Sequence, residues 1–376
     1  MNEDRFIKTS MASQDSFGYT KCLVNKDCKI YHAMTNFGHR SPQTKEPNSA
    51  MLTAYDLFSL KSQTPQRQPH VVTIGNFDGV HLGHCSLIQS VREEAFKHGL
   101  PCAAVTFNPH PQQLLDATRA PAPLTSLTHK LELLAKLELD LALVIPFTPG
   151  FATLSPDEFI RSVILAGLDM RHLVVGYDFA LGKERKGNFD VLHSMGMKYG
   201  FTVKQKDPFQ IKGIPVSSSR IRECIHNGFV DEAALLLGRP HCVEGSVVHG
   251  FGRGAGLGFP TININYGNTI LPAPGVYAVL VELAPSESIL PIMGVANIGN
   301  NPTFGAQALS LEAHLLDFSQ DIYGRSARIN FIKRLRGETC FPNVDALIRQ
   351  IADDISSTRA CFASMESTCR HIYKQG

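Results

Sequence analysis

Residues 71–84 constrain the fold of this chain more than any other part of the sequence. They begin with a run of β-branched and apolar residues, break at Gly75 and Gly79, and then pass two histidines as a helical pattern begins. This order predicts a strand, a tight loop and the N-terminus of a helix. The first amides of a helix are unpaired and the helix dipole is positive there, so the loop suits a phosphate group.

The two histidines, His81 and His84, are predicted to share one face of the first helical turn. From there they can donate hydrogen bonds to a phosphorus centre without forming a covalent intermediate. Two alternatives are half of a zinc site and an ordinary capped loop. No second Cys/His pair follows at zinc-finger spacing, and Gly79 and Gly83 would let a nucleotide approach the backbone closely. These features favour the phosphate interpretation.

Composition excludes several classes of protein. The 376 residues, 43% hydrophobic and 19% charged, are typical of a globular chain with two domains. A formal net charge of +2 argues against a general nucleic-acid binder. Nine cysteines include no Cys-x-x-Cys pair, which indicates reduced thiols. Neither a membrane-spanning apolar run nor a signal peptide is evident, so we expect a cytoplasmic protein that binds no membrane.

The region from His70 to residue 238 alternates predicted strands with predicted helices, which is typical of a parallel sheet covered by helices on both faces. Ligands of such sheets gather beyond the carboxyl ends of the strands. Residues 1–55 show little periodicity and are predicted to be weakly ordered. The predicted strands are 70–75, 102–107, 141–147 and 172–175, and the predicted helices are 84–98, 128–137, 156–165, 221–226 and 230–237.

Three further loops would lie at the same edge of the sheet. Asn108 and His110 alternate with two prolines in a rigid polar loop. Asp178 belongs to a glycine-bounded loop of acidic, aromatic and basic residues. The three serines 217–219 precede Arg222, so that a hydroxyl can cap a helix while the guanidinium binds the same anion. Each loop alone could equally be a turn, a solvated face or a helix cap.

A second domain begins after Gly238, Arg239 and Pro240, which end the helical pattern. Six short β-rich runs follow, and their spacing predicts a small barrel closed by a helix over residues 344–355. The tail from residue 356 has no clear assignment. The predicted barrel strands are 243–249, 261–265, 276–283, 289–298, 309–316 and 327–335.

A glycine-rich segment, residues 250–258, opens the barrel domain. It mimics a dinucleotide-binding fingerprint, but it leads into Pro260 and a strand, whereas the fingerprint must open a helix, and it lacks the end of a P-loop. A glycine arch whose amides wrap phosphates remains open. Thr261 and Asn263 alternate on one strand face beside it and could hold Mg²⁺.

Glu312 lies in an otherwise apolar predicted strand, with His314 on the same face two residues later. A partly desolvated carboxylate suits a general base that takes a proton from a substrate hydroxyl. The alternative is a glutamate on the solvent face of the strand.

Together, these motifs resemble the family of bifunctional bacterial riboflavin kinase/FMN adenylyltransferases, also called FAD synthetases. The resemblance implies an adenylyltransferase domain of the His-x-Gly-His type over residues 56–238, a riboflavin-kinase barrel over 241–356, and a C-terminal tail over 357–376. The barrel would use ATP and Mg²⁺ to phosphorylate riboflavin to FMN. The first domain would then join FMN and a second ATP into FAD and pyrophosphate. The resemblance is carried by residues 75–84, 107–111, 175–187, 217–222, 258–263, 294–304 and 311–324.

The resemblance also assigns roles to individual residues. Catalytic roles fall on His81, His84 and Glu312, the last as the base toward the ribityl terminal hydroxyl, and Thr261 and Asn263 would hold the metal. The implied ATP- and phosphate-binding residues are Gly75, Phe77, Asp78, Gly83, Ser218, Ser219, Arg222, Gly252, Gly254 and Gly258, and the implied flavin-binding residues are Asn108, His110 and Asp178.

One departure from the family pattern concerns the kinase. The family usually has an arginine where this chain has Ala255 and a small residue where it has Ile262, although Arg253 could supply the cation. An alternative is therefore an enzyme with adenylyl transfer only, whose barrel binds flavin. A non-catalytic flavin-binding protein is a second alternative, against which the intact catalytic residues argue.

We expect the protein to be a monomer or a weak homo-oligomer.

Overall fold

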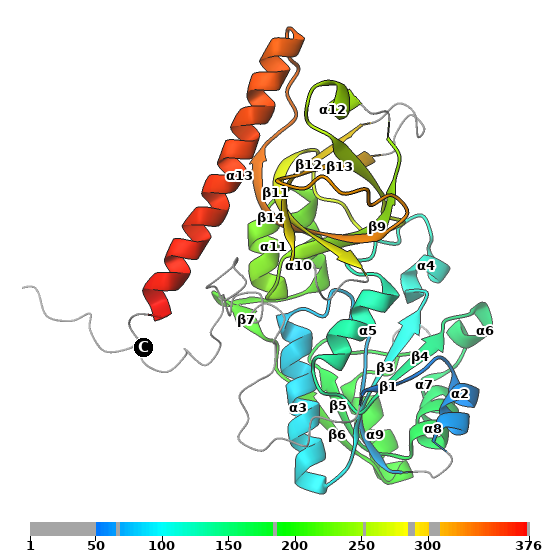
Figure 1. The fold of residues 1–376 in the computed structure, drawn as a ribbon. Helices are drawn as coiled ribbons and strands as arrows, with labels where there is room; N and C mark the ends of the chain where they lie inside the picture. Colours follow the sequence, from blue (N-terminus) through cyan, green and yellow to red (C-terminus); the bar gives the residue numbers. More distant parts are fainter. Residues whose placement is uncertain are drawn as a thin grey trace, which may run out of the picture.

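The computed structural model describes residues 50–64, 68–182, 186–250, 253–284, 290–300 and 309–373. They form a parallel sheet flanked by helices and a closed barrel with a long helix beside it (Figure 1). Most of the N-terminal extension predicted to be weakly ordered, together with Gly252, lies outside the described residues.

The sheet of the first domain has six parallel strands in the order β1-β4-β3-β2-β5-β6. The four strands predicted from sequence are all present, and two edge strands were missed. One consists of only three residues, and the other is largely polar, so neither shows an apolar run. The strands are β1 (Leu52–Ala54), β2 (His70–Ile74), β3 (Cys102–Asn108), β4 (Leu141–Pro146), β5 (Met170–Gly176) and β6 (Thr202–Lys206).

The chain order along this sheet reverses beside β2. Strands β3 and β4 follow on one side of β2, whereas β5 and β6 follow on the other. Such a reversal opens a crevice at the carboxyl ends of the strands, where open α/β sheets bind ligands. The glycine and histidine loop follows β2 and therefore lies at this point.

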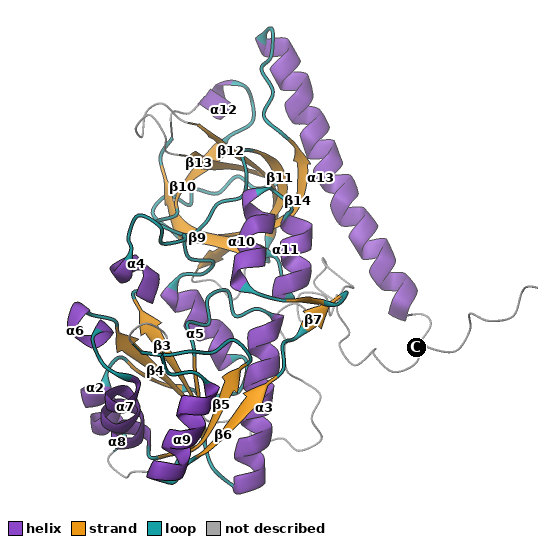
Figure 2. Ribbon diagram, turned by 180° about the vertical axis from the view of Figure 1, so that it is seen from behind, coloured by secondary structure: helices purple, strands orange, loops and turns teal. Residues whose placement is uncertain are grey.

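Helices cover both faces of the sheet (Figure 2). Neighbouring strand residues alternate between two cores: Val72 packs with Phe159 and Leu192 on one face, and Val71 packs with Ile88 and Leu134 on the other. The helices are α2 (Leu57–Gln63), α3 (Leu82–His98), α4 (Pro111–Leu115), α5 (Leu127–Ala135), α6 (Pro149–Ala152), α7 (Pro156–Phe159), the π-helical η1 (Ile160–Leu165), α8 (Ala166–Leu168), α9 (Phe189–Tyr199), α10 (Ser218–His226) and α11 (Val230–Leu237); β7 (Gln210–Ile211) and β8 (Ile214–Pro215) form a small hairpin.

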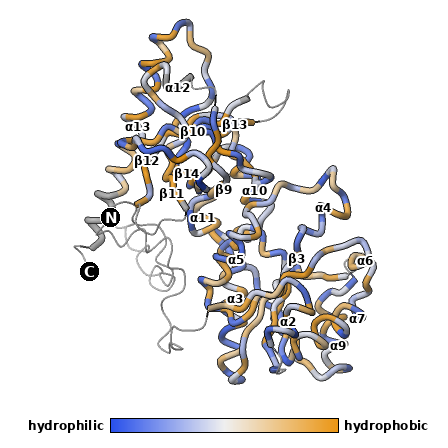
Figure 3. The backbone as a smooth tube through the Cα atoms, turned by 45° about the vertical axis from the view of Figure 1, so that its right-hand side comes forward, coloured by the Kyte–Doolittle hydropathy of each residue, from blue (hydrophilic) through white to orange (hydrophobic). Residues whose placement is uncertain are grey.

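The second domain is a closed antiparallel barrel in the order β10-β13-β12-β11-β14-β9, and all six predicted runs are strands. Its interior is apolar and includes the fully buried Tyr277 against Phe331. Figure 3 shows hydrophobic stretches along β11 and β12 in orange. The strands are β9 (His241–Val248), β10 (Thr261–Asn265), β11 (Gly275–Ala284), β12 (Ile292–Asn300), β13 (Leu309–Leu315) and β14 (Ser326–Arg336).

Helix α13 (Val344–Tyr373) runs well past residue 355, where the sequence analysis ended it. Its added length buries Phe362 against Ala278 and Ile332 of the barrel. Near its middle, Asp354 accepts hydrogen bonds from the Arg336 guanidinium at 3.0 and 2.9 Å. The helix therefore packs on the barrel at least as far as Phe362, and residues 356–373 continue it as helix.

The two domains meet where α5 packs against β9 and β14. Arg328 of the barrel donates to Glu132 of α5 at 2.7 Å and to Glu244 of β9 at 2.9 Å. Next to this ionic group, the Cys242 sulfur lies 3.2 Å from Nδ1 of His129, and both side chains are buried. The contact therefore combines a charged rim with a buried centre.

Acid should destabilise this junction. Burial lowers the pKa of His129 to about 2 and that of His241 to about 4. In the unfolded chain both histidines titrate near pH ~6.5, so below that pH the unfolded state takes up protons that the folded state does not. The free energy of unfolding then falls by about 1.4 kcal/mol per pH unit for each proton. The fall ends near pH 4 for His241 and near pH 2 for His129.

Urea unfolding between pH 7 and 4.5 measures this effect. His129→Gln should make the fall of the unfolding free energy with pH less steep, by up to the slope of one proton. The same change at the exposed His226 should leave that slope unaltered. Equal slopes for the unmodified protein and His129→Gln would contradict the expectation.

Candidate functional site

The loop between β2 and α3 has an unusual backbone. Phe77, Gly79 and Val80 all have positive φ angles of 47°, 82° and 36°, and Phe77 and Val80 are buried. A positive φ is costly for a β-branched residue, and such strain clusters at functional sites. Two side chains from elsewhere hold the loop in place. Thr125 Oγ1 accepts from the Gly79 amide at 3.3 Å, and Arg239 donates to the Gly79 and Val80 carbonyls at 2.6 and 3.1 Å.

The two histidines begin α3 as a pair. Nδ1 of His81 accepts from the His84 amide, and Nδ1 of His84 accepts from the His81 amide, both at 3.3 Å. Their rings stack with centroids 3.7 Å apart. Because each Nδ1 is an acceptor, the proton of each neutral ring lies on Nε2. The pair therefore offers two N–H donors, and the sequence-based prediction that both rings share one face of the first turn is confirmed.

Burial keeps both rings neutral. It lowers the pKa of His81 to about 3 and that of His84 well below its usual value, and the neighbouring Arg239 adds to both shifts. Near pH 7 the pair can donate hydrogen bonds but carries no charge, so positive charge at this site must come from other side chains. Gly83 is required for the packing, because a Cβ there would lie 2.9 Å from the His81 ring.

Arg222 is held beside this loop by Asp78. The Asp78 carboxylate is buried, forms an ion pair with Arg222 and accepts from the Leu124 amide at 3.0 Å. Arg222 also donates to the Ala122 carbonyl at 3.0 Å, and Ser218 donates to the Asp78 carbonyl at 2.9 Å. Loop 75–84 and α10, far apart in sequence, are thus joined. Asp78 acts here as the partner of a cation.

The predicted flavin-binding residues lie at the carboxyl edge of the sheet. Asn108 ends β3 with an exposed side chain. His110 caps α4 by accepting from the Gln112 amide at 3.2 Å, and burial lowers its pKa while the Asp78 carboxylate opposes the shift. His110 therefore lies within electrostatic range of the phosphate-binding loop. Asp178 is exposed in the loop that follows β5.

Two cations of this region, the first half-buried and the second buried, were missed by the sequence analysis. Arg239 lies in the connection between α11 and β9, and Lys130 lies on α5 with 7% of its surface exposed. Lys130 had a signal, since it stands at helical spacing between Leu127 and Leu134, where a third apolar residue is expected. Arg239 had none, because its contacts lie about 160 residues away.

The predicted kinase residues share the outer face of the barrel. Thr261 is opposite His314, and Asn263 is opposite Glu312, on the adjacent strands β10 and β13. Glu312 also faces Asn297 of β12. Directly opposite side chains in antiparallel strands point to the same side. Asn263, Glu312 and Asn297 therefore form a polar row across three strands, and Glu312 is half-buried within it.

The glycine segment folds against this row. A Cβ on Gly250 would lie 1.9 Å from the Asn263 side-chain nitrogen, and a Cβ on Gly254 would lie 3.2 Å from Thr261 Oγ1. These glycines let the backbone approach the two predicted metal-binding side chains. The segment then forms one helical turn, α12 (Arg253–Gly256), and a turn at Gly258 with φ of 86° before β10 begins.

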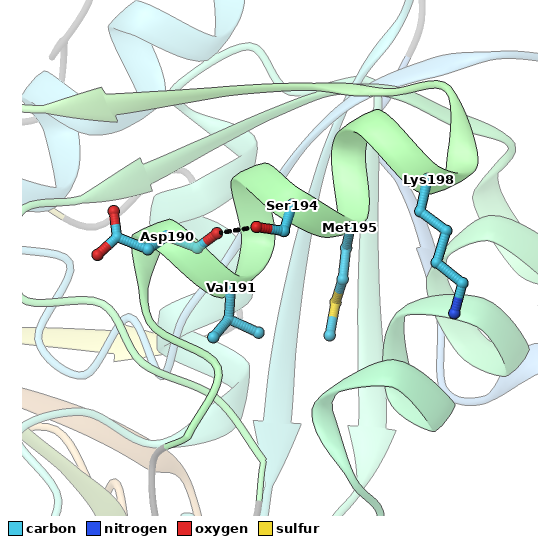
Figure 4. A pocket seen from close by; sticks show the side chains of 5 residues that line it. All are labelled: Asp190, Val191, Ser194, Met195 and Lys198. Carbon is cyan, nitrogen blue, oxygen red and sulfur yellow. Dashed lines mark hydrogen bonds between the residues drawn. The ribbon is translucent and has the colours of Figure 1, made fainter.

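Two other features lie outside these groups. Glu94, His98 and His172 have donor atoms within 4.8 Å of one another, but Glu94 already pairs with Lys97 at 3.4 Å and Lys204 at 3.2 Å. A hollow beside α9 is lined by Asp190, Val191, Ser194, Met195 and Lys198 (Figure 4). Its Ser194 hydroxyl donates to the Asp190 carbonyl, and none of its residues was assigned a role from sequence.

No helix among the described residues has both the length and the apolar character needed to span a bilayer.

Comparison with known proteins gives matches in both domains. A family model described as FAD synthetase matches residues 63–220, and one described as riboflavin kinase matches residues 237–362. The bifunctional riboflavin kinase/FMN adenylyltransferase of Escherichia coli K12 is 41% identical over 301 residues, which cover 80% of this chain and 95% of that protein. The enzyme of the same description from Bacillus subtilis 168 is 38% identical over 301 residues, covering 78% and 93%.

A solved structure shares the fold. A crystal structure from Streptococcus pneumoniae, described as a macrolide-efflux protein, matches with a TM-score of 0.71 and 29% sequence identity. The match covers 82% of this chain and 99% of that one. The arrangement of sheet and barrel is therefore found in an experimental structure.

Proposed function

This chain belongs to the family of bifunctional riboflavin kinase/FMN adenylyltransferases, and we propose which of its residues carry the two reactions. The enzyme phosphorylates riboflavin to FMN with ATP and adenylylates FMN to FAD. The observation that carries this conclusion is the match of both family models within one chain, together with 41% identity over 95% of a bifunctional relative. The same matches favour two activities over adenylyl transfer alone.

We propose that His81, His84 and Arg222 act in adenylyl transfer. An oxygen of the FMN phosphate attacks the α-phosphorus of ATP, and the bond to the β-phosphate oxygen breaks as pyrophosphate leaves. The attacking group is already an anion, so the site must supply positioning and charge stabilisation rather than a strong base. The two Nε2–H groups would donate to the reacting phosphate, and Arg222, oriented by Asp78, would neutralise it. Ser218 and Ser219 would complete the phosphate contacts.

We propose that Glu312 is the base of the kinase. As the primary hydroxyl attacks the γ-phosphorus of ATP, the bond from that phosphorus to the β-phosphate oxygen breaks and ADP leaves. The hydroxyl must lose its proton in this step, and a half-buried carboxylate in a polar row is suited to accept that proton. Thr261 and Asn263 offer a hydroxyl and an amide oxygen on the same face, the donor type that Mg²⁺ prefers. They would hold Mg²⁺, which neutralises phosphate charge when bound.

The proposal extends to the setting of the enzyme. We propose a cytoplasmic monomer or weak homo-oligomer with small-molecule substrates and no nucleic-acid partner. The cysteines support a reducing compartment, since six of those within the described residues are free thiols.

Chromatography of the flavins over time tests the proposed function directly. Purified protein with riboflavin, ATP and Mg²⁺ should form FMN first and FAD later. If riboflavin persists while supplied FMN is converted to FAD, the kinase assignment fails and the barrel only binds flavin. If neither flavin is converted, both assignments fail.

A further inference from the structure

Lys130 is a buried lysine whose amine has no hydrogen-bond or ion-pair partner among the described residues. Only 7% of the residue is exposed, and the described part of the chain supplies neither a hydrogen-bond acceptor nor an ion-pair partner for its Nζ. Buried ammonium groups are normally paired, because their desolvation is costly. Burial accordingly lowers the pKa of Lys130, and only the Asp78 carboxylate opposes this shift. The Nζ itself is not among the fully buried unpaired atoms of the described residues, so it stays accessible, as a site that an anion enters requires.

Helix α5, which carries Lys130, follows a segment that is hydrogen-bonded to the loop between β2 and α3. Just before α5, the Leu124 amide donates to Asp78 at 3.0 Å and the Thr125 hydroxyl accepts from the Gly79 amide at 3.3 Å. The charge of Lys130 acts on His84 and His110, where it helps to lower both pKa values. Lys130 therefore lies on the helix that begins at the phosphate-binding loop, and its charge reaches both histidines.

The charges around the histidines do not balance. The charged groups acting on His81, His84 and His110 are Arg222, Arg239 and Lys130 on the positive side and Asp78 on the negative side. The Asp78 carboxylate already forms an ion pair with Arg222.

No carboxylate among the described residues pairs with Arg239 either. Its opposing groups are the thiols of Cys85 and Cys242, and burial raises both thiol pKa values to about 12, so they stay neutral. The region around the histidines thus holds excess positive charge among the residues that the structure describes.

We propose that Lys130 is a further phosphate-contacting residue of adenylyl transfer, whose ammonium binds phosphate oxygens of ATP or of FMN. The proposal rests on the adenylyltransferase activity proposed above. Lys130 stays protonated and forms no covalent bond. It would offset the negative charge as the FMN phosphate approaches the triphosphate, whose mutual repulsion otherwise opposes the reaction.

The test replaces Lys130 in the full-length enzyme. Lys130→Met should lower kcat/KM for FAD formation roughly 10- to 100-fold, the usual loss for one charge-assisted contact. Lys130→Arg, which keeps the charge, should recover much of it. Lys136→Met is the matched control, because it makes the same change at an exposed position at the end of the same helix and should leave the rate within about twofold. A thermal melt of each variant reports whether the protein is folded, and riboflavin phosphorylation reports the barrel domain.

Two further readouts separate contact from structure. A rise in the KM for ATP alone assigns the contact to the nucleotide, and a rise in the KM for FMN alone assigns it to the flavin phosphate. FAD formation should also decline at alkaline pH as the lysine, with its lowered pKa, loses its charge. Lys130→Arg should remove that decline, because an arginine stays protonated.

Three outcomes would overturn the proposal: activity of Lys130→Met within twofold of the unmodified enzyme, equal loss in Lys130→Met and Lys130→Arg, or an alkaline limb unchanged by Lys130→Arg. If the unmodified protein makes no FAD, the proposed function fails instead. Titration with ATP and with FMN separately then decides the Lys130 proposal, which requires weaker binding of one of them by Lys130→Met.

Discussion

Riboflavin phosphorylation by Glu312→Gln should fall by about 100- to 10,000-fold, the range expected when a general base is lost, while FMN adenylylation stays within about twofold. The amide keeps the size and hydrogen-bonding capacity of the side chain between Asn263 and Asn297, so the barrel should fold normally. It cannot accept the proton of the ribityl hydroxyl. Initial rates of FMN formation from riboflavin, and of FAD formation from supplied FMN, measure the two effects in one preparation.

Asp345→Asn is a suitable control for Glu312→Gln. Asp345 is exposed in the first turn of α13, in the same domain, and its amide variant should retain both activities. If Glu312→Gln loses both reactions equally, the assignment of Glu312 to one domain's chemistry is incorrect. Retention of kinase activity would remove Glu312 as the base.

The second large effect concerns the histidine pair. His84→Ala should lower FMN adenylylation by about 100- to 1000-fold, the usual loss for one preorganised donor at a charged transition state, and should spare riboflavin phosphorylation. The change removes one Nε2–H donor and also the acceptor of the His81 amide, so His81 loses its stacking partner. Kinetic assays of both reactions, with a thermal melt of each variant, separate lost chemistry from lost folding.

His226→Ala removes an exposed histidine from α10 and should change neither rate, which makes it the control for His84→Ala. An unaltered rate of FAD formation by His84→Ala would show that the pair is a structural cap. A matching loss of kinase activity would indicate global unfolding.

The strands of both domains were largely predictable because their apolar runs are long. The exceptions follow from local sequence. Strand β6, at the edge of the sheet, consists mostly of polar residues, and β1 is too short to show a hydrophobic period. The length of α13 had a signal in the spacing of Ile355, Thr358 and Phe362, which lie three and four residues apart. Composition alone does not show what such a face packs against.

The site was predictable where it depended on neighbours in sequence. His81 and His84 pair within one helical turn, and the order of the two motifs placed Arg222 in the same domain. The role of Asp78 was not predictable, because its partner Arg222 lies 144 residues away. Lys130 was hidden for a similar reason, since its surroundings depend on how α5 docks.

The guanidinium of Arg239 also bears on how separable the two catalytic units are. Arg239 lies at the start of the connection to the barrel, yet its guanidinium donates hydrogen bonds to the Gly79 and Val80 carbonyls, just before His81. A fragment ending at Gly238 would keep every residue assigned to adenylyl transfer and still lose the clamp on its strained loop. The boundary between the two domains therefore falls after Arg239. Any fusion or engineered separation of the domains must keep this arginine on the same chain as the first domain.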